Sequence, residues 1–335
     1  MSTASPAEPE LSVIVATHNR RDLLRRCIDS LARQTAPPTS FEVIVADDGS
    51  NDGTTAMAEA LRPPFRIRIL ELPKSGHAVA QNAAIELAAA PYCLLLDDDV
   101  IASPDLVGGH IEGHRQHPGA IGIGSLTQRP VDAQDWFAHA VARGWSEHYD
   151  DLERRPAHWT DCYGANLSFP TAAIRELGGV STDIPSAKDF DLALRLCAAG
   201  LTPVYFPHAH GVHDDQKRSS KMLVDAQRAG RMHVELSRRF PAAAPELLDW
   251  QGGAGPVELR LRRWSLALHV PLRPLVALGR FLPGDGRKMI WLHFVRRYAF
   301  WRGVAESVDG RTFRRLVEAD RAAPTGEPVV QDGVR

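Results

Sequence analysis

The stretch PYCLLLDDDV, residues 91–100, decides the fold, because an apolar run in it ends abruptly in three acidic side chains. Residues 92–96 are apolar or aromatic throughout, which is typical of a strand covered on both faces of a parallel sheet. Asp97, Asp98 and Asp99 follow without a spacer. They are therefore expected at the carboxyl end of a strand, where open α/β sheets bind their ligands.

Before this stretch, the same unit of a strand and a helix occurs three times. Apolar runs predict strands at 11–16, 41–46 and 67–72, and the segments after them have helical character at 22–34, 53–61 and 78–90. This alternation predicts right-handed βαβ crossovers and a parallel sheet with helices on both faces. After residue 101 the pattern is less regular, with turns expected at Gly108-Gly109 and Gly178-Gly179 and a helix at 189–199.

The three adjacent aspartates need a compensating charge, because carboxylates crowded into a dry site repel one another. A divalent cation is the economical answer, since hard carboxylate oxygens suit Mg²⁺ or Mn²⁺. Such an ion also neutralises a diphosphate leaving group. The alternative is that Asp97–Asp99 cap the next helix and face solvent, a task for which one aspartate suffices.

Polar residues also follow the first two strands, at Thr17–Arg20 and at Asp47–Thr54. In parallel strands these positions meet the aspartates at one edge of the sheet. A carboxylate at Asp47 or Asp48 can cap the following helix, or it can accept the N–H of a nucleobase.

Five runs taken together carry a resemblance. They are VIVATHNR (13–20), VADDGSNDGT (45–54), LDDD (96–99), GANLSF (164–169) and DFDLALRL (189–196). In this order and spacing they resemble family 2 of the GT-A-fold glycosyltransferases, over residues 11–215. The resemblance implies an α/β fold with a Rossmann-like, mainly parallel sheet flanked by helices, here followed by a helical, basic C-terminal extension.

The resemblance also implies roles on the donor side. Thr17, Asn19 and Arg20 then line the nucleotide pocket, and Asp48 reads the base. Asp97–Asp99 match the D-x-D element, in which Asp99 is the surest metal ligand, Asp97 its partner, and Asp98 the variable middle position on the nucleotide sugar. His213, in the run YFPHAHGVHDD at 205–215, is expected near the diphosphate as a further ligand of Mn²⁺ or Mg²⁺.

On the acceptor side, the resemblance implies a general base at the start of the helix at 189–199. The family usually has an acidic pair there, whereas this chain has Lys188-Asp189. Asp189 is the expected base, and a neighbouring lysine should lower its proton affinity. Asp191 is the second choice. The structural alternative is that Asp189 caps the helix and Asp191 pairs with Arg195, four residues on.

Composition bounds the class of protein. The fractions of 44% hydrophobic and 24% charged residues are those of an ordinary globular chain. Four separated cysteines, without a C-x-x-C pair, predict reduced and mostly buried thiols. Trp136, Trp145, Trp159 and Tyr163 fall in the acceptor half, where aromatic faces either stack on a sugar or pack in the core.

The C-terminal part is basic, with 13 Lys/Arg against 4 Asp/Glu between residues 257 and 315. Such a surface either contacts an anionic membrane or forms a helical lid or dimer surface. The side chains that suggest the membrane are Arg260, Arg262, Arg263, Arg296 and Arg297, with Trp264, Trp291 and Trp301.

The expected organisation is a flexible tail at 1–10, a catalytic domain at 11–215, a helical region at 216–317 and a disordered tail at 318–335. Within the catalytic domain, 11–100 is the nucleotide-sugar half and 101–215 the acceptor half. Without a visible signal peptide or spanning segment, the expected location is cytoplasmic, including the inner face of the membrane.

The favoured function is inverting, metal-dependent transfer of a sugar from a nucleotide diphosphate to a hydroxyl of an acceptor, either lipid-linked or a small molecule. No nucleic-acid partner is expected. Because Lys188 replaces an acid, a non-catalytic nucleotide-sugar-binding or scaffold protein is the alternative. A dinucleotide enzyme is disfavoured, since no G-x-G-x-x-G follows the first strand.

Overall fold

The computed structural model describes residues 8–130, 134–214, 219–248 and 256–319, and its chain divides into two compact units, 1–216 and 217–335. Each unit is treated separately below. The predicted tails at 1–10 and 318–335 lie mostly outside the described residues. Where they are described they are structured: the backbone N–H of Glu10 donates to the carbonyl of Ser40 at 2.8 Å, and helix α13 extends to Ala319.

The first unit is built on one eight-stranded sheet in the order β3-β2-β1-β4-β7-β6-β8-β5. β1, β2, β3 and β4 run parallel, and β7 and β5 pair antiparallel with their neighbours. The strands are β1 Leu11–Thr17, β2 Phe41–Asp48, β3 Arg66–Leu72, β4 Tyr92–Leu96, β5 Val100–Ala102, β6 Ala120–Gln128, β7 Asn166–Pro170 and β8 Thr202–His213. The predicted α/β class is confirmed.

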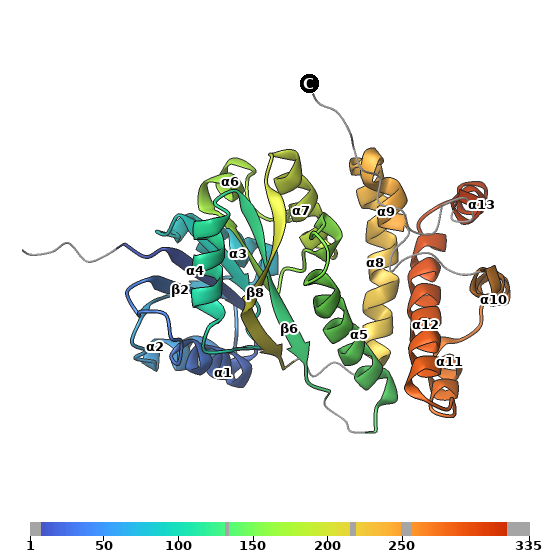
Figure 1. The fold of residues 1–335 in the computed structure, drawn as a ribbon, viewed down its shortest axis with the longest axis horizontal. Coiled ribbons are helices and arrows are strands. Elements are labelled where there is room, and N and C mark those ends of the chain that lie inside the picture. Colours follow the sequence, from blue (N-terminus) through green and yellow to red (C-terminus); the bar gives the residue numbers. More distant parts are fainter. Residues whose placement is uncertain (1–7, 131–133, 215–218, 249–255, 320–335) are drawn as a thin grey trace, which may run out of the picture. The chain divides into compact units, whose positions relative to one another are not determined.

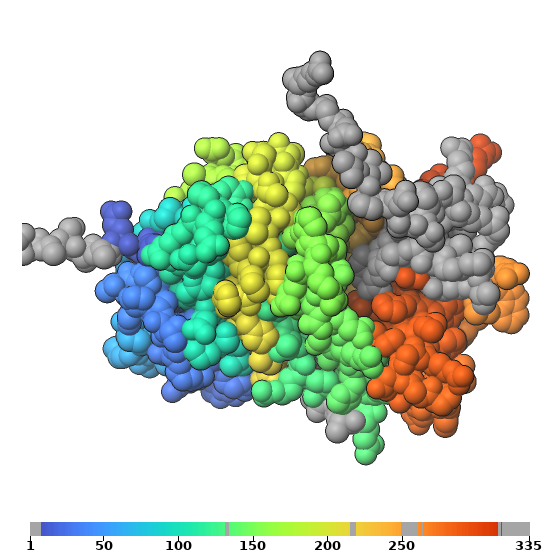
Figure 2. All heavy atoms as spheres, viewed as in Figure 1, coloured from blue at the N-terminus to red at the C-terminus, as the bar shows by residue number. Residues whose placement is uncertain are grey.

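Seven α-helices surround this sheet in the described part of the first unit (Figure 1). They are α1 Arg21–Leu31, α2 Thr54–Ala60, α3 His77–Leu87, α4 Leu106–Gln116, α5 Trp136–Leu152, α6 Thr171–Glu176 and α7 Lys188–Ala198. Figure 2 shows α4 and α5 on either side of the exposed part of β8. The strands β1 and β2 are buried along their whole length, as their continuous apolar runs predict.

The turn predicted at Gly108-Gly109 is wrong, because both residues lie inside α4. A Cβ atom on Gly109 would stand 2.5 Å from the carbonyl carbon of His208 in β8, and one on Gly113 would stand 2.5 Å from the ring of Phe206. These glycines are therefore needed for a close approach of helix and strand. The expected turn at Gly178-Gly179 is present, with φ of 76° and 84°.

A bulge interrupts the pairing of β6 with β8 between Gly124 and Ser125. Asn166 of β7 fills it, since its side-chain amide donates to the carbonyl of Ala209 at 2.9 Å and its Oδ1 lies 2.8 Å from Nε2 of His110. Burial lowers the pKa of His110 to about 4, so its ring is neutral at pH 7. The bulge sets the course of the last residues of β8, which end at the site described below.

The second unit is helical. Its helices are α8 Ser219–Arg239, α9 Ala244–Leu248, α10 Pro256–Ala267, α11 Leu272–Gly279, α12 Asp285–Ala305 and α13 Gly310–Ala319, with a short 3₁₀ turn at Pro241–Ala243. Glycines let α8 and α12 approach closely: a Cβ on Gly230 would stand 2.0 Å from the carbonyl oxygen of Phe300. Within the described ranges, no helix has both the length and the apolar character needed to span a membrane.

Candidate functional site

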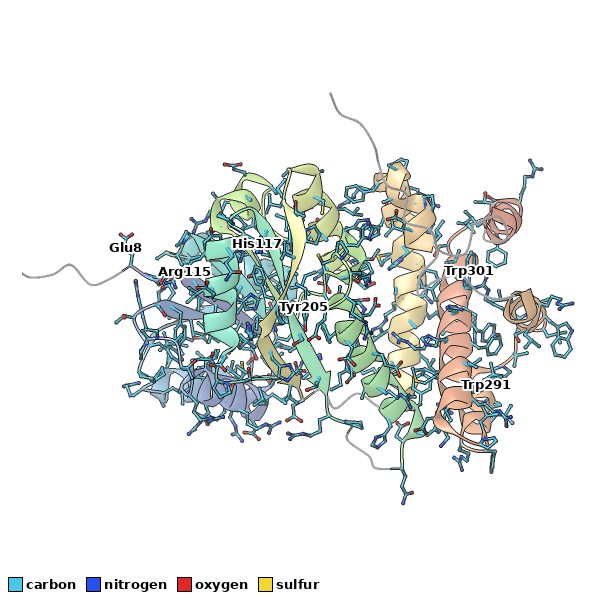
Figure 3. All side chains as sticks on the ribbon, viewed as in Figure 1. Glu8, Arg115, His117, Tyr205, Trp291 and Trp301 are labelled. Atoms are coloured by element: carbon cyan, nitrogen blue, oxygen red, sulfur yellow. The ribbon has the colours of Figure 1, made fainter. Side chains whose placement is uncertain are left out.

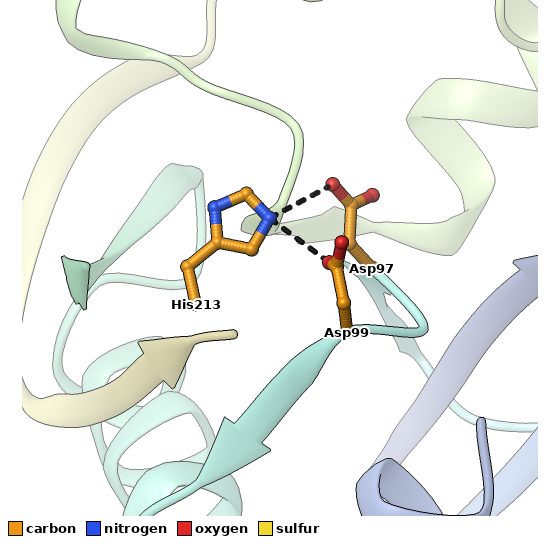
Figure 4. Close-up of side chains that lie close together, drawn as sticks. All are labelled: Asp97, Asp99 and His213. Carbon is orange, nitrogen blue, oxygen red and sulfur yellow. Dashed lines mark ion pairs between the residues drawn. The ribbon is translucent and has the colours of Figure 1, made fainter. Parts of the chain in front are cut away.

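Asp97, Asp99 and His213 meet at the carboxyl end of β4 (Figure 4). The aspartates occupy the turn between β4 and β5, which is closed by a 3.1 Å hydrogen bond from the N–H of Val100 to the carbonyl of Asp97. Val100 is paired with His213 across β5 and β8. Nε2 of His213 consequently lies 2.9 Å from Oδ1 of Asp99 and 4.0 Å from Oδ2 of Asp97.

This cluster suits a divalent cation. One ligand atom from each of its three side chains lies within 4.8 Å of the others. Oδ1 of Asp99 is buried beside Nε2 of His213, and His213 and Arg20 lower the pKa of Asp99 to about 2 against the effect of burial, so its carboxylate is ionised at neutral pH. Two carboxylates and an imidazole are a donor set that Mn²⁺ accepts readily, and Mg²⁺ takes the carboxylates.

Asp98 points to different partners. Its Oδ2 accepts a 2.7 Å hydrogen bond from the hydroxyl of Thr17, and its Oδ1 lies 3.3 Å from Nε of Arg20. Arg20 also donates to Oδ2 of Asp99. Burial raises the pKa of Asp98 to about 7, although Arg20 and Thr17 act in the opposite direction. Thr17 and Arg20 thus join the first strand to the aspartates.

Asn19 fixes the loop after β1 against the loop after β2. It has a left-handed backbone, with φ of 52°, a conformation that asparagine tolerates better than most residues. Its N–H donates to the hydroxyl of Ser50 at 2.7 Å, and its side-chain oxygen accepts from the N–H of Asn51 at 2.8 Å. The two polar segments therefore form one edge, as the parallel topology predicts.

Asp48, at the end of β2, is engaged by the loop after β3. Its Oδ2 lies 2.8 Å from Nζ of Lys74, and its Oδ1 accepts from the N–H groups of Ser75 at 2.6 Å and Gly76 at 2.9 Å. Burial opposes its charge, but these donors prevail and lower the pKa of Asp48 to about 2. Lys74 and Asp48 are 26 residues apart in the chain, and the parallel pairing of β2 with β3 brings them together.

Asp189 lies in the first turn of α7, beside Gly164. Oδ1 of its carboxylate would be only 2.5 Å from a Cβ on Gly164, whose backbone N–H donates to the carboxylate. Burial raises the pKa of Asp189 to about 6, and the negative charge of Asp97 adds to the rise. Lys188 and the Gly164 N–H act against it. Lys188 thus lowers the pKa of Asp189, as expected from its charge, but burial has the larger effect and the net shift is upward.

Asp191 is not brought to the same place. Its side chain is fully buried, with Oδ2 at 2.8 Å from Nε of Arg195 and accepting from the hydroxyl of Ser181. Arg195 in turn donates to the carbonyl of Gly179 at 2.9 Å. These contacts are those of the structural alternative, in which Asp191 anchors α7 to the preceding turn. Of the two aspartates, Asp189 alone is therefore the candidate base.

A group of aromatic side chains surrounds Tyr163, which directly precedes Gly164 in the chain. The rings of Trp145 and Tyr163 meet edge to face with centroids 4.6 Å apart, and Phe190 of α7 lies 5.7 Å from Tyr163. Trp145 and Tyr163 are half-buried, whereas Trp159 is buried against Phe190. The described contacts of Trp136 include the neighbouring Phe137, at 5.6 Å. Of the four aromatics that the sequence suggested, Tyr163 directly precedes Gly164, which contacts the candidate base, and Trp145 packs against Tyr163.

Comparison with known proteins gives a family match. The model of glycosyl transferase family 2 matches residues 12–178. Validoxylamine A glucosyltransferase of Streptomyces hygroscopicus subsp. limoneus is 29% identical over 305 residues, covering 79% of this chain and 66% of the relative. The uncharacterized glycosyltransferase YfnE of Bacillus subtilis is 33% identical over 263 residues, covering 64% and 67%. The chain thus spans about two thirds of the length of both relatives.

Solved structures agree on the fold. Residues 1–349 of S. aureus TarS, in complex with UDP-GlcNAc, superpose with a TM-score of 0.57 at 17% identity, covering 93% of this chain and 92% of that one. The mannosyltransferase PcManGT from Pyrobaculum calidifontis, in complex with GDP-Man and Mn²⁺, gives 0.55 at 20% identity, covering 96% and 82%. At these identities the likeness extends to the fold alone.

Proposed function

The chain belongs to glycosyltransferase family 2, and from that premise we propose that it moves a sugar from a nucleotide diphosphate to an acceptor hydroxyl, with inversion and with a divalent metal. The observation that carries the proposal is the position of Asp189. Its pKa is raised, and the negative charge of Asp97, a member of the candidate metal-ligand cluster, contributes to the rise. A proton acceptor and a diphosphate-binding centre then share one site.

Asp189 is the group that takes the proton of the acceptor hydroxyl. A pKa of about 6 keeps most of its carboxylate ionised at pH 7, yet makes it a better proton acceptor than a solvent-exposed aspartate. The attacking oxygen forms a bond to the anomeric carbon as the bond to the diphosphate breaks, and the proton passes to Asp189. One displacement of this kind inverts the anomeric configuration.

Asp97, Asp99 and His213 are the residues that would hold Mn²⁺ or Mg²⁺, which supplies positive charge to the departing diphosphate when bound. Arg20, whose guanidinium reaches Asp98 and Asp99, lies at the same edge and offers a second positive charge. Thr17 holds Asp98 in place. Asn19 and Asp48, on the loops after β1 and β2, are proposed to contact the nucleoside.

The acceptor is proposed to lie on the half-buried rings of Trp145 and Tyr163, next to the base. Aromatic faces suit a polyhydroxylated ring, because its C–H groups pack on the ring while its hydroxyls stay solvated. The name of the Streptomyces relative indicates glucosyl transfer, so glucose nucleotides head the list of donors to test, followed by the UDP-GlcNAc and GDP-Man of the structural relatives.

The test is a thermal-shift screen of nucleotide sugars with and without Mn²⁺, followed by measurement of nucleoside diphosphate release with and without acceptors. A donor that binds the native state raises its melting temperature. Asp99→Asn is expected to abolish the metal dependence and the turnover together. Unchanged turnover and metal dependence in Asp99→Asn refute the proposal. Donor binding without hydrolysis or transfer over a broad acceptor panel favours the non-catalytic alternative that Lys188 suggested.

A further inference from the structure

Large apolar side chains on α10, α11 and the start of α12 face solvent. Trp264 on α10 is 64% exposed, and Leu268, the residue after the end of α10, is 56% exposed. Phe281, just after α11, is 76% exposed, and Ile290 on α12 is 70% exposed. The wider set is Leu261, Trp264, Leu268, Leu278, Phe281 and Ile290. Isolated exposed apolar residues are ordinary, but a set of this size on three consecutive elements points to an interaction surface.

The orientation of α10 strengthens this conclusion, because large apolar side chains of the helix face solvent while two of its polar side chains are buried. Leu261, Trp264 and Leu268 follow the spacing of one helix face. Arg262 and Ser265 are buried instead, at 2% and 5% exposure. The guanidinium of Arg262 lies over the ring of Trp301 at 4.8 Å. Such an inverted helix would be unfavourable in water alone.

The surface is also basic. Between residues 260 and 290 the chain has seven Lys/Arg and one Asp/Glu. Arg273, Arg280 and Arg287 are exposed, and Lys288 is half-buried; within the described ranges none of these four forms an ion pair. The guanidinium of Arg280 lies 5.8 Å from the ring of Phe281. Exposed cations are thus interleaved with exposed aromatic and aliphatic side chains.

Only some of the residues expected from the sequence to meet a membrane are exposed. Trp291 and Trp301 both lie on α12 (Figure 3), but Trp301 is buried and Nε1 of Trp291 donates to the carbonyl of Leu275 at 2.7 Å. Arg262 and Arg297 are buried too. The side chain of Arg263 lies outside the described residues.

We propose that α10, α11 and the first turns of α12 dock this chain on an anionic lipid bilayer. Figure 1 shows α10 and α11 on the side of α12 away from α8. Trp264, Phe281 and Leu268 enter the boundary between headgroups and acyl chains, and Arg273, Arg280 and Arg287 contact the lipid phosphates. Charge decides for lipid over a second copy of the chain, because two such basic faces repel each other.

The test is flotation of the purified chain with vesicles of phosphatidylcholine, alone or with about 30 mol % phosphatidylglycerol. The wild type is expected to float with the anionic vesicles and to dissociate as salt is raised. Trp264→Glu combined with Phe281→Glu is expected to abolish flotation. Arg280→Gln combined with Arg287→Gln is expected to weaken binding by about fivefold per charge.

The matched control is Val224→Glu, which places the same charge at a 45% exposed apolar position of α8 and is expected to float like the wild type. All these positions are exposed, so unchanged melting temperatures are expected to show intact folding. Equal binding to neutral and anionic vesicles overturns the proposal, as does flotation of Trp264→Glu/Phe281→Glu at the wild-type level. A dimer in sedimentation that these substitutions dissociate, with no flotation, assigns the surface to a second copy instead.

Discussion

Gly164→Ala tests whether Asp189 must stand where the structure places it. The new Cβ would lie 2.5 Å from Oδ1 and 3.0 Å from Cγ of Asp189, so the carboxylate must retreat by about 1 Å to reach an ordinary contact. A displacement of this size in a reacting group costs about 100-fold in rate. We expect kcat to fall by that factor, because the base no longer reaches the acceptor hydroxyl.

Other consequences of the substitution should be small. Gly164 is not among the glycines with positive φ, so alanine brings no backbone strain there. The three heavy atoms nearest to the new Cβ all belong to Asp189, so the residues proposed to bind the donor are not displaced directly, and the donor KM should stay within about threefold. Gly119→Ala is the matched control, since a Cβ at Gly119 meets nothing within 4 Å.

The assay is steady-state release of nucleoside diphosphate, with the donor and acceptor found in the screen. If Gly164 acts only through Asp189, Gly164→Ala adds no loss to Asp189→Asn, and the double variant matches the single one. A Gly164→Ala enzyme with wild-type kcat refutes the assignment of Asp189 as the base. Full additivity of the two losses refutes the proposed route from Gly164 to the reaction.

Three further predictions concern the same unit. With Asp189 as base, kcat/KM should fall as the pH drops through about 6. Lys188→Met should move this acid limb of the pH–rate profile to higher pH, since the lysine lowers the pKa of Asp189. An acid limb that does not move in the variant contradicts the prediction. His213→Ala should weaken Mn²⁺ binding by about tenfold or more in thermal-shift titrations, while the exposed His208→Ala should not; equal effects contradict the site. Asp191→Ala should cost about 1.5–3 kcal/mol of unfolding free energy in urea, because Arg195 and Ser181 lose the buried carboxylate that they bind. An undiminished stability contradicts the role of Asp191 as an anchor.

The alternating frame was predictable because it rests on local pattern. The strands at 11–17, 41–48 and 92–96 are mainly apolar, and polar residues stand at or just after the carboxyl end of each, at the same edge of the sheet. The resemblance then pointed to Asp99 and His213. Their proximity depends on the pairing of Val100 with His213, more than a hundred residues apart in the chain, a register that local pattern does not encode.

The burial of individual charged side chains could not be predicted from the sequence. Lys188 lowers the pKa of Asp189, as its charge predicts, but burial raises that pKa by more, and the net shift is upward. Arg262 was expected on the surface, whereas it is buried against Trp301 while Trp264 is exposed. Both outcomes depend on burial in the tertiary structure, and the sequence shows only the charge of each side chain.

The turn at Asp97–Asp99 explains why three adjacent carboxylates can coexist. The chain reverses there, so Asp98 is directed to Thr17 and Arg20, while Asp97 and Asp99 face His213. Asp98 is therefore compensated by the protein itself, through a hydroxyl and a guanidinium. Asp99 is compensated as well, because His213 at 2.9 Å and the guanidinium of Arg20 lower its pKa to about 2 in spite of its burial. Asp97 and the ionised Asp99 can thus present two carboxylates, together with the imidazole of His213, to a single divalent cation.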